Sequence, residues 1–225
     1  MMTPIAHHLE SATTLRLDLQ PEQPVWVAAA SWLAKDPWIA QETLVLDAVP
    51  EDGLAPAIAT KFPPLEQFTA HEQPGRLYLT PDLPGELQHY VLTPGRMLLV
   101  QSAGLVAAGP GVAVEPQFPG MRNFFNGDRL MLLRLSGSGD VWFNTYGGRI
   151  EIPVTGNTIV ETGYVTAFED QLSYQVEMLS GLSLRGFETT RQGGEGLVCR
   201  FRGEGRLWVQ ARNFYAMINT LDLLA

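Results

Sequence analysis

The sequence predicts an all-β protein, a β-sandwich or distorted β-barrel built from three related strand units. Short apolar runs alternate with polar residues at a period of two, as in Leu15, Leu17 and Leu19, which is typical of strands with one buried face. Glycine-rich turns separate these runs and recur along the chain at nearly equal distances. A helical period is evident only after Asn213.

The first third of the chain predicts strands that are interrupted by one loop-like segment. We expect strands near residues 14–20, 25–29 and 31–34, where apolar residues dominate or alternate. Between residues 37 and 64 repeated prolines weaken the strand signal, and residues 43–46 form the clearest strand there. This segment is therefore expected to be a loop or an insertion.

A strand, a glycine turn and a return strand then occur three times. Val141 lies 64 residues after Leu77, and Leu207 lies 66 residues after Val141, so these three positions are equivalent. The third copy stops near residue 213, and its missing half resembles residues 19–34. We therefore expect the N-terminal strands to complete the C-terminal copy and to close the structure around a pseudo-threefold axis, leaving no free sheet edge.

These patterns predict one domain over residues 1–225. Its units would span residues 65–125, residues 126–190, and residues 191–213 completed by residues 14–60. Residues 1–13 are expected to form a mobile N-terminus. Residues 214–225 are expected to form a short amphipathic helix, because the following residues fall at helical spacing: Phe214, Met217, Ile218, Leu221 and Leu224.

Composition excludes several classes of function. A formal charge of −9 argues against a nucleic-acid partner, because such binding depends on cations that meet phosphates. The single cysteine, Cys199, allows no intramolecular disulfide and is compatible with a reducing compartment. Residues 1–8 do not read as a secretory signal, and glycine and proline interrupt the most apolar run, so no transmembrane segment is expected. We expect a soluble, cytoplasmic protein.

No arrangement typical of catalysis is evident, so the sequence predicts no enzyme, no metal and no cofactor. The four histidines are scattered, whereas a metal site needs them at ligand spacing. Glu169 and Asp170 lie at an expected hairpin turn, and adjacent turn residues point apart. The glycine-rich loops precede strands rather than the helix that a phosphate-binding loop requires. Cys199 alternates with Leu197 and Phe201 and is expected to be buried.

The remaining candidates point to an interaction surface. Tryptophan and arginine are favoured at interfaces, and low charge favours self-association, so we expect an oligomeric scaffold or protein-binding module. Trp26, Trp38 and Trp142 are further candidates for exposed aromatic residues. The alternative is a protein that binds a small ligand in a pocket between repeats or subunits. The candidate interface residues are Trp208, Arg200, Arg202, Phe214, Met217 and Leu221.

Two ordered motifs carry a resemblance to a known family. Residues 194–212 contain Gly-Glu-Gly-Leu followed by Leu-Trp-Val-Gln-x-Arg, and residues 135–170 contain Leu-Ser-Gly-Ser-Gly-Asp-Val-Trp and Ala-Phe-Glu-Asp. Over residues 14–213 the chain resembles the family of altered inheritance of mitochondria protein 24. The resemblance implies the fold of the tryptophan RNA-binding attenuator protein (TRAP-like), often assembled as a trimer, without established catalytic residues. It also links a mitochondrial relative to inner-membrane organisation, which leaves peripheral membrane association open.

Overall fold

The computed structural model describes residues 4–29, 31–44, 64–117, 130–178 and 197–213. Within these residues the protein is all-β, as expected, with seventeen strands and two short 3₁₀ turns. The N-terminal group of strands comprises β1 (Ala6–Ser11), β2 (Thr14–Leu19), β3 (Pro24–Ala28), β4 (Trp32–Lys35), β5 (Ile39–Leu44), β6 (Leu65–Ala70) and β7 (Gly75–Leu79). The middle group comprises β8 (Leu87–Leu92), β9 (Met97–Gln101), η1 (Ser102–Gly104), β10 (Leu105–Ala108), β11 (Val112–Gln117), β12 (Leu132–Gly137) and β13 (Gly139–Asn144). The C-terminal group comprises β14 (Arg149–Glu161), η2 (Thr162–Tyr164), β15 (Val165–Glu169), β16 (Ser173–Met178) and β17 (Leu197–Gln210).

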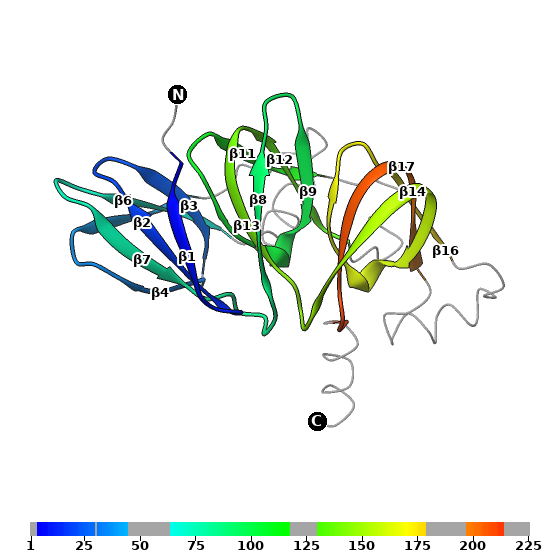
Figure 1. The fold of residues 1–225 in the computed structure, drawn as a ribbon, viewed down its shortest axis with the longest axis horizontal. Coiled ribbons are helices and arrows are strands. Elements are labelled where there is room, and N and C mark those ends of the chain that lie inside the picture. Colours follow the sequence, from blue (N-terminus) through cyan, green and yellow to red (C-terminus); the bar gives the residue numbers. More distant parts are fainter. Residues whose placement is uncertain (1–3, 30, 45–63, 118–129, 179–196, 214–225) are drawn as a thin grey trace, which may run out of the picture.

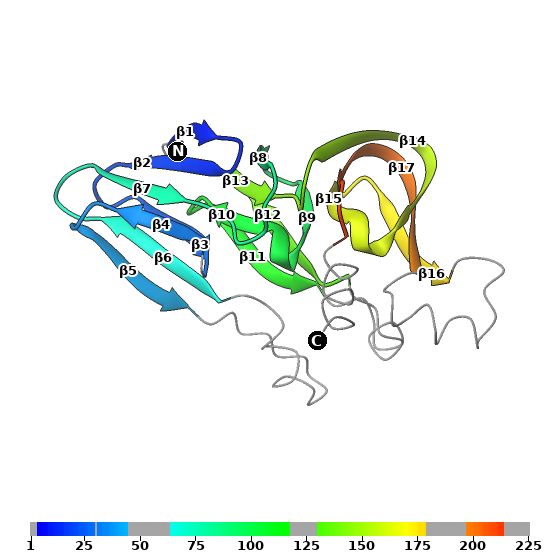
Figure 2. The same cartoon turned by 90° about the horizontal axis from the view of Figure 1, so that it is seen from below.

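The three groups stand in a row, with the N-terminal group at one end and the C-terminal group at the other (Figures 1 and 2). Their strands pair in three sheets, with the orders β1-β2-β7-β4, β5-β6-β3-β10-β13-β8 and β11-β12-β9-β15-β17-β14. The pairs β3–β10 and β9–β15 connect neighbouring groups, and both are antiparallel. Each group is therefore joined to the next by one strand pair, which we call a junction.

Strands β4, β10 and β15 share one irregularity in their pairing. Each shifts register by one residue against its partner within the group, which is β7, β13 or β17 respectively. An extra residue of this kind is a β-bulge, which bends the strand and increases its twist. The shifts lie between Trp32 and Ala34, between Leu105 and Ala107, and between Val165 and Ala167.

Buried apolar side chains form three clusters along the row. The alternation that predicted β2 holds, because Leu15, Leu17 and Leu19 are all fully buried in the first cluster. That cluster also contains Trp142 of β13, and the second contains Trp208 of β17. Each of these tryptophans thus belongs to the cluster that precedes its own group, and the cores cross the junctions. Cys199 is buried in the third cluster, as expected.

The predicted closure of the first strands onto the last is wrong. Residues 14–35 pair with β1, β6, β7 and β10, whereas β17 lies at the opposite end of the row (Figure 1). The reason is that β14 pairs with β17 over thirteen consecutive positions, from Arg149↔Gln210 to Glu161↔Val198. This one long strand takes the place that the sequence pattern assigned to the N-terminal strands.

The expected mobile N-terminus also needs correction. Residues 6–11 form β1, which pairs antiparallel with β2, and the side chain of Ile5 is only 3% exposed. An apolar anchor and a strand ladder order this segment, which the sequence pattern did not reveal. The predicted helix over residues 214–225 lies outside the described residues, as do residues 45–63 of the proline-rich segment.

Two glycines are required by the backbone conformation. Gly137 and Gly203 have φ angles of 105° and 126°, in the region that L-residues rarely adopt. A Cβ atom on Gly137 would lie 2.2 Å from the carbonyl oxygen of Gly111, and one on Gly203 would lie 2.5 Å from that of Gln171. The return of the chain predicted at these glycines is wrong, because β12 and β13 on either side of Gly137 lie in different sheets and Gly203 lies within the continuous strand β17.

Candidate functional site

The first candidate surface is the free edge of β4. This strand ends its sheet, where it pairs with β7 alone among the described strands. Its residues Trp32 and Leu33 are 39% and 56% exposed, although both are large and apolar. Trp38, just beyond the strand, is 37% exposed and donates its indole N–H to the carbonyl oxygen of Pro74 at 3.1 Å.

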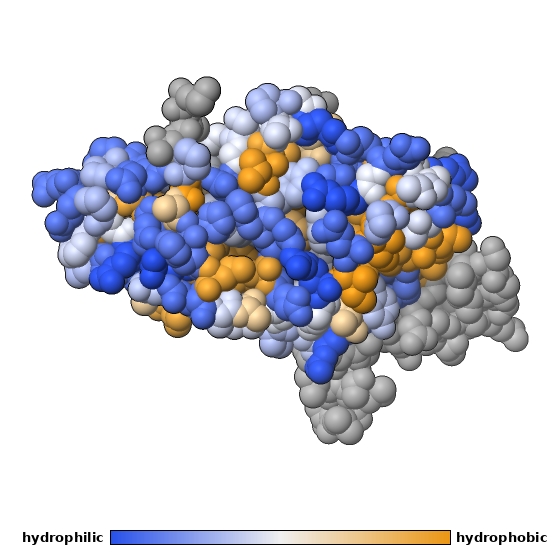
Figure 3. All heavy atoms as spheres, viewed as in Figure 1, coloured by the Kyte–Doolittle hydropathy of each residue, from blue (hydrophilic) through white to orange (hydrophobic). Residues whose placement is uncertain are grey.

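The second candidate surface is the last part of β14, residues 157–161, at the other end of the row. Within the described residues this part pairs with β17 on one side only. Ile159 is 47% exposed there, and Tyr164 in the following 3₁₀ turn is 36% exposed. Figure 3 shows apolar surface gathered at this end of the molecule, over β14 and η2.

The two junctions within the chain show how much of a strand edge is buried when another strand pairs with it. β10 and β15 are buried at every position, whereas β4 is exposed at three of its four positions. The registers are Ala107↔Val27 and Ala108↔Trp26 at the first junction, and Ala167↔Val100 and Phe168↔Leu99 at the second. An edge of this type is therefore closed by an antiparallel strand from the adjoining group.

A polar network reinforces the second junction. The backbone N–H of Arg206 donates to Oε2 of Glu169 at 2.8 Å, and its guanidinium Nη2 donates to Oε1 at 2.8 Å. The hydroxyl of Tyr90, from the middle group, donates to the same Oε1 at 3.2 Å. The guanidinium also lies 5.0 Å from the Trp208 ring centroid and 5.3 Å from that of Tyr90, which is cation–π geometry.

The network shifts the pKa of its charged members. Burial alone acts to raise the pKa of the Glu169 carboxyl, but the hydrogen bonds and charge of Arg206 outweigh it and lower the pKa. Burial likewise acts to lower the pKa of Arg206, but the hydrogen bonds to Glu169 and its charge outweigh burial, so the pKa of Arg206 is raised. Both groups are therefore held in their charged forms beside the junction, which the hydrogen bond from Tyr90 crosses.

A similar ion pair, between Asp36 and Arg76, lies beside the edge of β4. The backbone N–H of Arg76 donates to Oδ2 of Asp36 at 2.8 Å, and the guanidinium Nε approaches the same atom at 3.4 Å. The hydrogen bond from this backbone N–H is the main cause that lowers the pKa of Asp36. The side chain of Arg76 is 59% exposed, compared with 47% for Arg206 at the second junction.

The predicted interface residues do not form one surface. Trp208 is fully buried and donates its indole N–H to Oε2 of Glu151 at 2.9 Å. Arg200 is half-buried and donates to Oε1 of Glu177, while Arg202 is exposed on the same strand. Phe214, Met217 and Leu221 lie outside the described residues.

The expectation of exposed Trp142 and Trp208 is wrong, because β13 and the end of β17 are covered on both faces. Alternation identifies an outward face only where a strand is covered on one side. The exposed residues that sequence reasoning missed are Trp32, Leu33 and Ile159. The run Ser31-Trp32-Leu33-Ala34 predicts an ordinary strand. The side chains of Trp32 and Leu33 are exposed because this strand lies at the end of the row.

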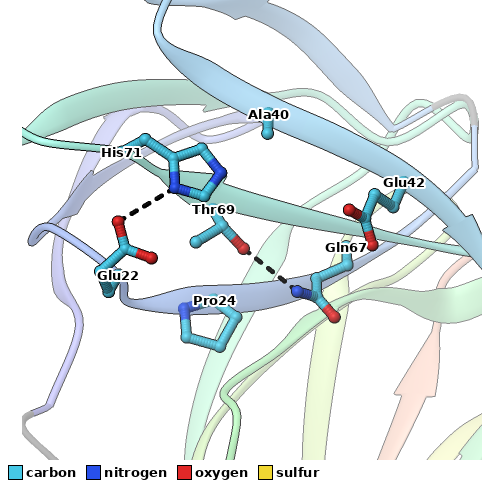
Figure 4. Close-up of a pocket in the computed structure, with 7 residues that line it drawn as sticks. All are labelled: Glu22, Pro24, Ala40, Glu42, Gln67, Thr69 and His71. Atoms are coloured by element: carbon cyan, nitrogen blue, oxygen red, sulfur yellow. Dashed lines mark hydrogen bonds and ion pairs between the residues drawn. The ribbon is translucent and has the colours of Figure 1, made fainter.

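One hollow with a volume of about 250 Å³ lies on the sheet face formed by β3, β5 and β6 (Figure 4). His71 Nδ1 lies 3.0 Å from Oε1 of Glu22 at its rim, and the amide of Gln67 donates to Thr69 at 3.2 Å. The hollow belongs to the N-terminal group alone, so it differs from the expected pocket between repeats. The residues that line it are Glu22, Pro24, Ala40, Glu42, Gln67, Thr69 and His71.

The fold and the two edges define the class of this protein: an all-β chain whose strand groups are joined edge to edge, with an open edge on each end group. The chain belongs to the family described as Mitochondrial biogenesis AIM24, whose model matches residues 5–212. This confirms the resemblance seen in the sequence. None of the described helical turns has the length or apolar character needed to cross a lipid bilayer.

Two similar proteins come from Streptococcus pyogenes. An uncharacterised protein of serotype M6 is 27% identical over 149 residues, which cover 65% of this chain and 58% of that protein, so the match spans less than two thirds of the relative. An X-ray crystal structure of an S. pyogenes protein from a structural genomics programme has a TM-score of 0.79 at 18% identity. That match covers 98% of this chain and 99% of the other, and it shows a shared fold.

Proposed function

We propose that this protein is a non-enzymatic scaffold that assembles from identical copies, with β4 of one copy pairing with residues 157–161 of the next. The observation that carries this proposal is the exposure of two apolar strand edges at opposite ends of one row. Burying an exposed apolar edge stabilises association, and an uncovered edge is a template for strand addition. A second copy is the natural occupant, because each chain carries both edges.

The proposal includes an internal repeat, in which the three groups are copies of one TRAP-like unit. Matched pairings support this. β4, β10 and β15 correspond, as do β3, β9 and the last part of β14, because each makes the same pairs within its group. In this repeat the strand pairs β3–β10 and β9–β15 form the two junctions inside the chain. Among the described residues, β4 at one end and residues 157–161 at the other lack the strand that would complete a third junction.

The filled junctions predict the register between copies. Ala34 corresponds to Ala107 and Ala167, and Val160 corresponds to Val27 and Val100. We therefore expect Ala34 of one copy to face Val160 of its neighbour, with Lys35 facing Ile159. This pairing would unite the end strands in one sheet of order β16-β17-β14-β4-β7-β2-β1.

Burial at the corresponding positions supports the same arrangement. Leu33 is 56% exposed, whereas Val106 at the corresponding position of β10 is 1% exposed. Ile159 is 47% exposed, whereas Leu99 of β9 is 8% exposed. A neighbouring copy would bring both end residues to the burial that their counterparts already have.

Such an interface is heterologous, because it joins two different surfaces. A heterologous interface closes into a ring when its rotation allows and otherwise extends into a filament. The family resemblance favours a trimer. The ring or filament would serve as a scaffold for other components, and its cytoplasmic location and lack of nucleic-acid partner stay predictions from the sequence.

Two single substitutions test the interface separately. Leu33→Lys blocks the β4 edge, and Ile159→Lys blocks the β14 edge, because assembly would bury a lysine charge without a partner. We expect each variant to be a monomer in sedimentation velocity, whereas the wild type forms a defined oligomer. Val91→Lys is the matched control, since Val91 is 58% exposed on β8, away from both edges.

Mixing the two blocked variants gives the sharpest test. Leu33→Lys keeps an intact β14 edge, and Ile159→Lys keeps an intact β4 edge, so an equimolar mixture should form a dimer and nothing larger. A wild type that stays monomeric at micromolar concentration contradicts the proposal. So does a mixture that stays monomeric while circular dichroism shows both variants folded.

The hollow on β3, β5 and β6 is the observation that favours the second candidate function, the binding of a small ligand. Its two glutamates and its histidine suit a small cationic compound. A thermal-shift screen of amino acids and polyamines tests this, with Glu42→Gln as the variant that should remove any shift. Absence of a shift at millimolar ligand contradicts this second candidate.

A further inference from the structure

The N-terminal strand β1 is held against the middle group by contacts outside its own ladder. It pairs with β2 on one side, and the residue before it, Ile5, is buried in the first core cluster. The backbone N–H of Ile5 donates to Oδ2 of Asp140, on β13, at 3.3 Å. β1 therefore bridges the N-terminal and middle groups.

Two histidine rings are in contact where β1 lies against β8. The rings of His7, on β1, and His89, on β8, have centroids 4.1 Å apart. The ring of His89 stacks on the indole of Trp142 at 5.4 Å, and His7 meets the same indole edge-on at 5.6 Å. His89 Nε2 lies 2.8 Å from Oδ1 of Asp140, so the one carboxylate contacts both His89 and the backbone of Ile5.

Few charges are available to compensate protons on these rings. Asp140 of β13 is the carboxylate that contacts these rings, and the two rings contact each other from β1 and β8. The other charged residues of β1 and β2 contact each other: His8 lies 3.2 Å from Asp18, and Arg16 bonds Glu10 and Asp18. Within the described residues the indole nitrogen of Trp142 has no hydrogen-bond partner, and as a donor it cannot accept a proton from either ring.

We propose that His7 and His89 form an acid-sensitive latch that holds β1 on the middle group at neutral pH and releases it when both rings are protonated. Two like charges at this separation repel, and only one carboxylate is present to offset them. Release would free the outer edge of β2 and expose Ile5. This goes beyond the proposed assembly, because β1 and β4 lie at opposite edges of their sheet.

The electrostatic surroundings of His89 agree with the latch. Burial lowers its pKa, the hydrogen bond to Asp140 acts in the opposite direction, and the neighbouring His7 lowers the pKa further. The net direction is downward from the ordinary value of 6.5, so the folded latch takes up a proton less readily than the released strand. Acidification below that value therefore favours the released strand, and a return to neutral pH favours the latch.

Amide hydrogen exchange measures the release directly. After correction for intrinsic rates, the amides of residues 6–11 should lose up to about tenfold of their protection between about pH 7.5 and pH 5.5, because a ring that is protonated only in the released strand shifts the equilibrium about tenfold for each pH unit below its ordinary pKa. Amides of β6 and β7 should keep their protection, which separates strand release from global unfolding.

Three variants make the test specific. His89→Gln should keep β1 protected at both pH values, because the second charge can no longer form. His7→Gln should act in the same way, and it covers the case in which His89→Gln fails to fold. His71→Gln is the control, since His71 pairs with Glu22 on another surface, and it should retain the wild-type response.

Equal protection of residues 6–11 at the two pH values overturns the latch. A pH response that survives in both His89→Gln and His7→Gln also overturns it. Either result leaves the proposed assembly standing, because the oligomer is measured by sedimentation with variants of different strands.

Discussion

Arg206 and Glu169 are joined by three hydrogen bonds, one from the backbone N–H at 2.8 Å and two from the guanidinium, from Nε at 3.0 Å and Nη2 at 2.8 Å. This pair fastens β17 to β15 at the point where β15 meets the middle group. Because the Tyr90 hydroxyl also donates to Glu169, one carboxylate connects three strands that are distant in sequence.

The first prediction concerns this carboxylate. Glu169→Gln should lower the free energy of unfolding by about 1–3 kcal/mol, because it leaves the part-buried donors of Arg206 and Tyr90 without their charged acceptor. Urea unfolding at fixed protein concentration measures the change. Glu115→Gln is the control, because the Glu115–Arg134 pair is exposed, and exposed pairs contribute about 0–1 kcal/mol. Equal losses in both variants would contradict the assigned role of Glu169.

The second prediction is a pH dependence from the same residue. Its folded pKa lies below the ordinary value of 4.5, so Glu169 contributes stability above that value and loses it as the pH falls through the folded pKa. The urea midpoint of the wild type should therefore fall more steeply in this acid range than that of Glu169→Gln. Parallel pH profiles for the two proteins would show that the carboxylate is not linked to folding.

The third prediction compares two glycines with similar backbone angles. Gly203 and Gly156 have φ angles of 126° and 110°, but only Gly203 lies against another backbone segment, at the carbonyl of Gln171. Gly156→Ala should cost about 1–2 kcal/mol through strain alone. Gly203→Ala should cost clearly more, because its Cβ would force β17 away from the carbonyl oxygen of Gln171. Thermal unfolding of both variants checks the order.

The fourth prediction isolates one hydrogen bond in a double-mutant cycle. Trp208→Phe and Glu151→Ala each break the bond between the indole N–H and the carboxylate. The double variant should recover a coupling energy of about 1 kcal/mol relative to the sum of the single variants. Strict additivity would mean that this bond contributes nothing measurable to stability.

Sequence reasoning succeeded where local chemistry decides the structure. The leucines of β2 alternate because one face of that strand is buried, and glycine occupies position 203 because the close backbone approach admits no side chain. Both signals can be read within a few residues. The buried position of Cys199 followed from the same alternation.

Prediction from sequence failed where contacts with residues far along the chain decide the structure. β4 and β10 both read as apolar strands, yet β10 is buried and β4 is exposed, because only β10 has a preceding group to pair with. Trp208 alternates like a surface residue, but the middle group covers its outer face. The wrong closure has the same origin, since no local pattern shows that β14 pairs with β17 over thirteen consecutive positions.

The shared one-residue bulge in β4, β10 and β15 has a geometric consequence for assembly. If β4 bends where it joins a neighbour as β10 and β15 bend inside the chain, every step around the assembly turns through the same angle. Curvature, rather than concentration or affinity, would then set how many copies complete a circle. Deleting the extra residue from β4 alone would be expected to open that circle or change its diameter.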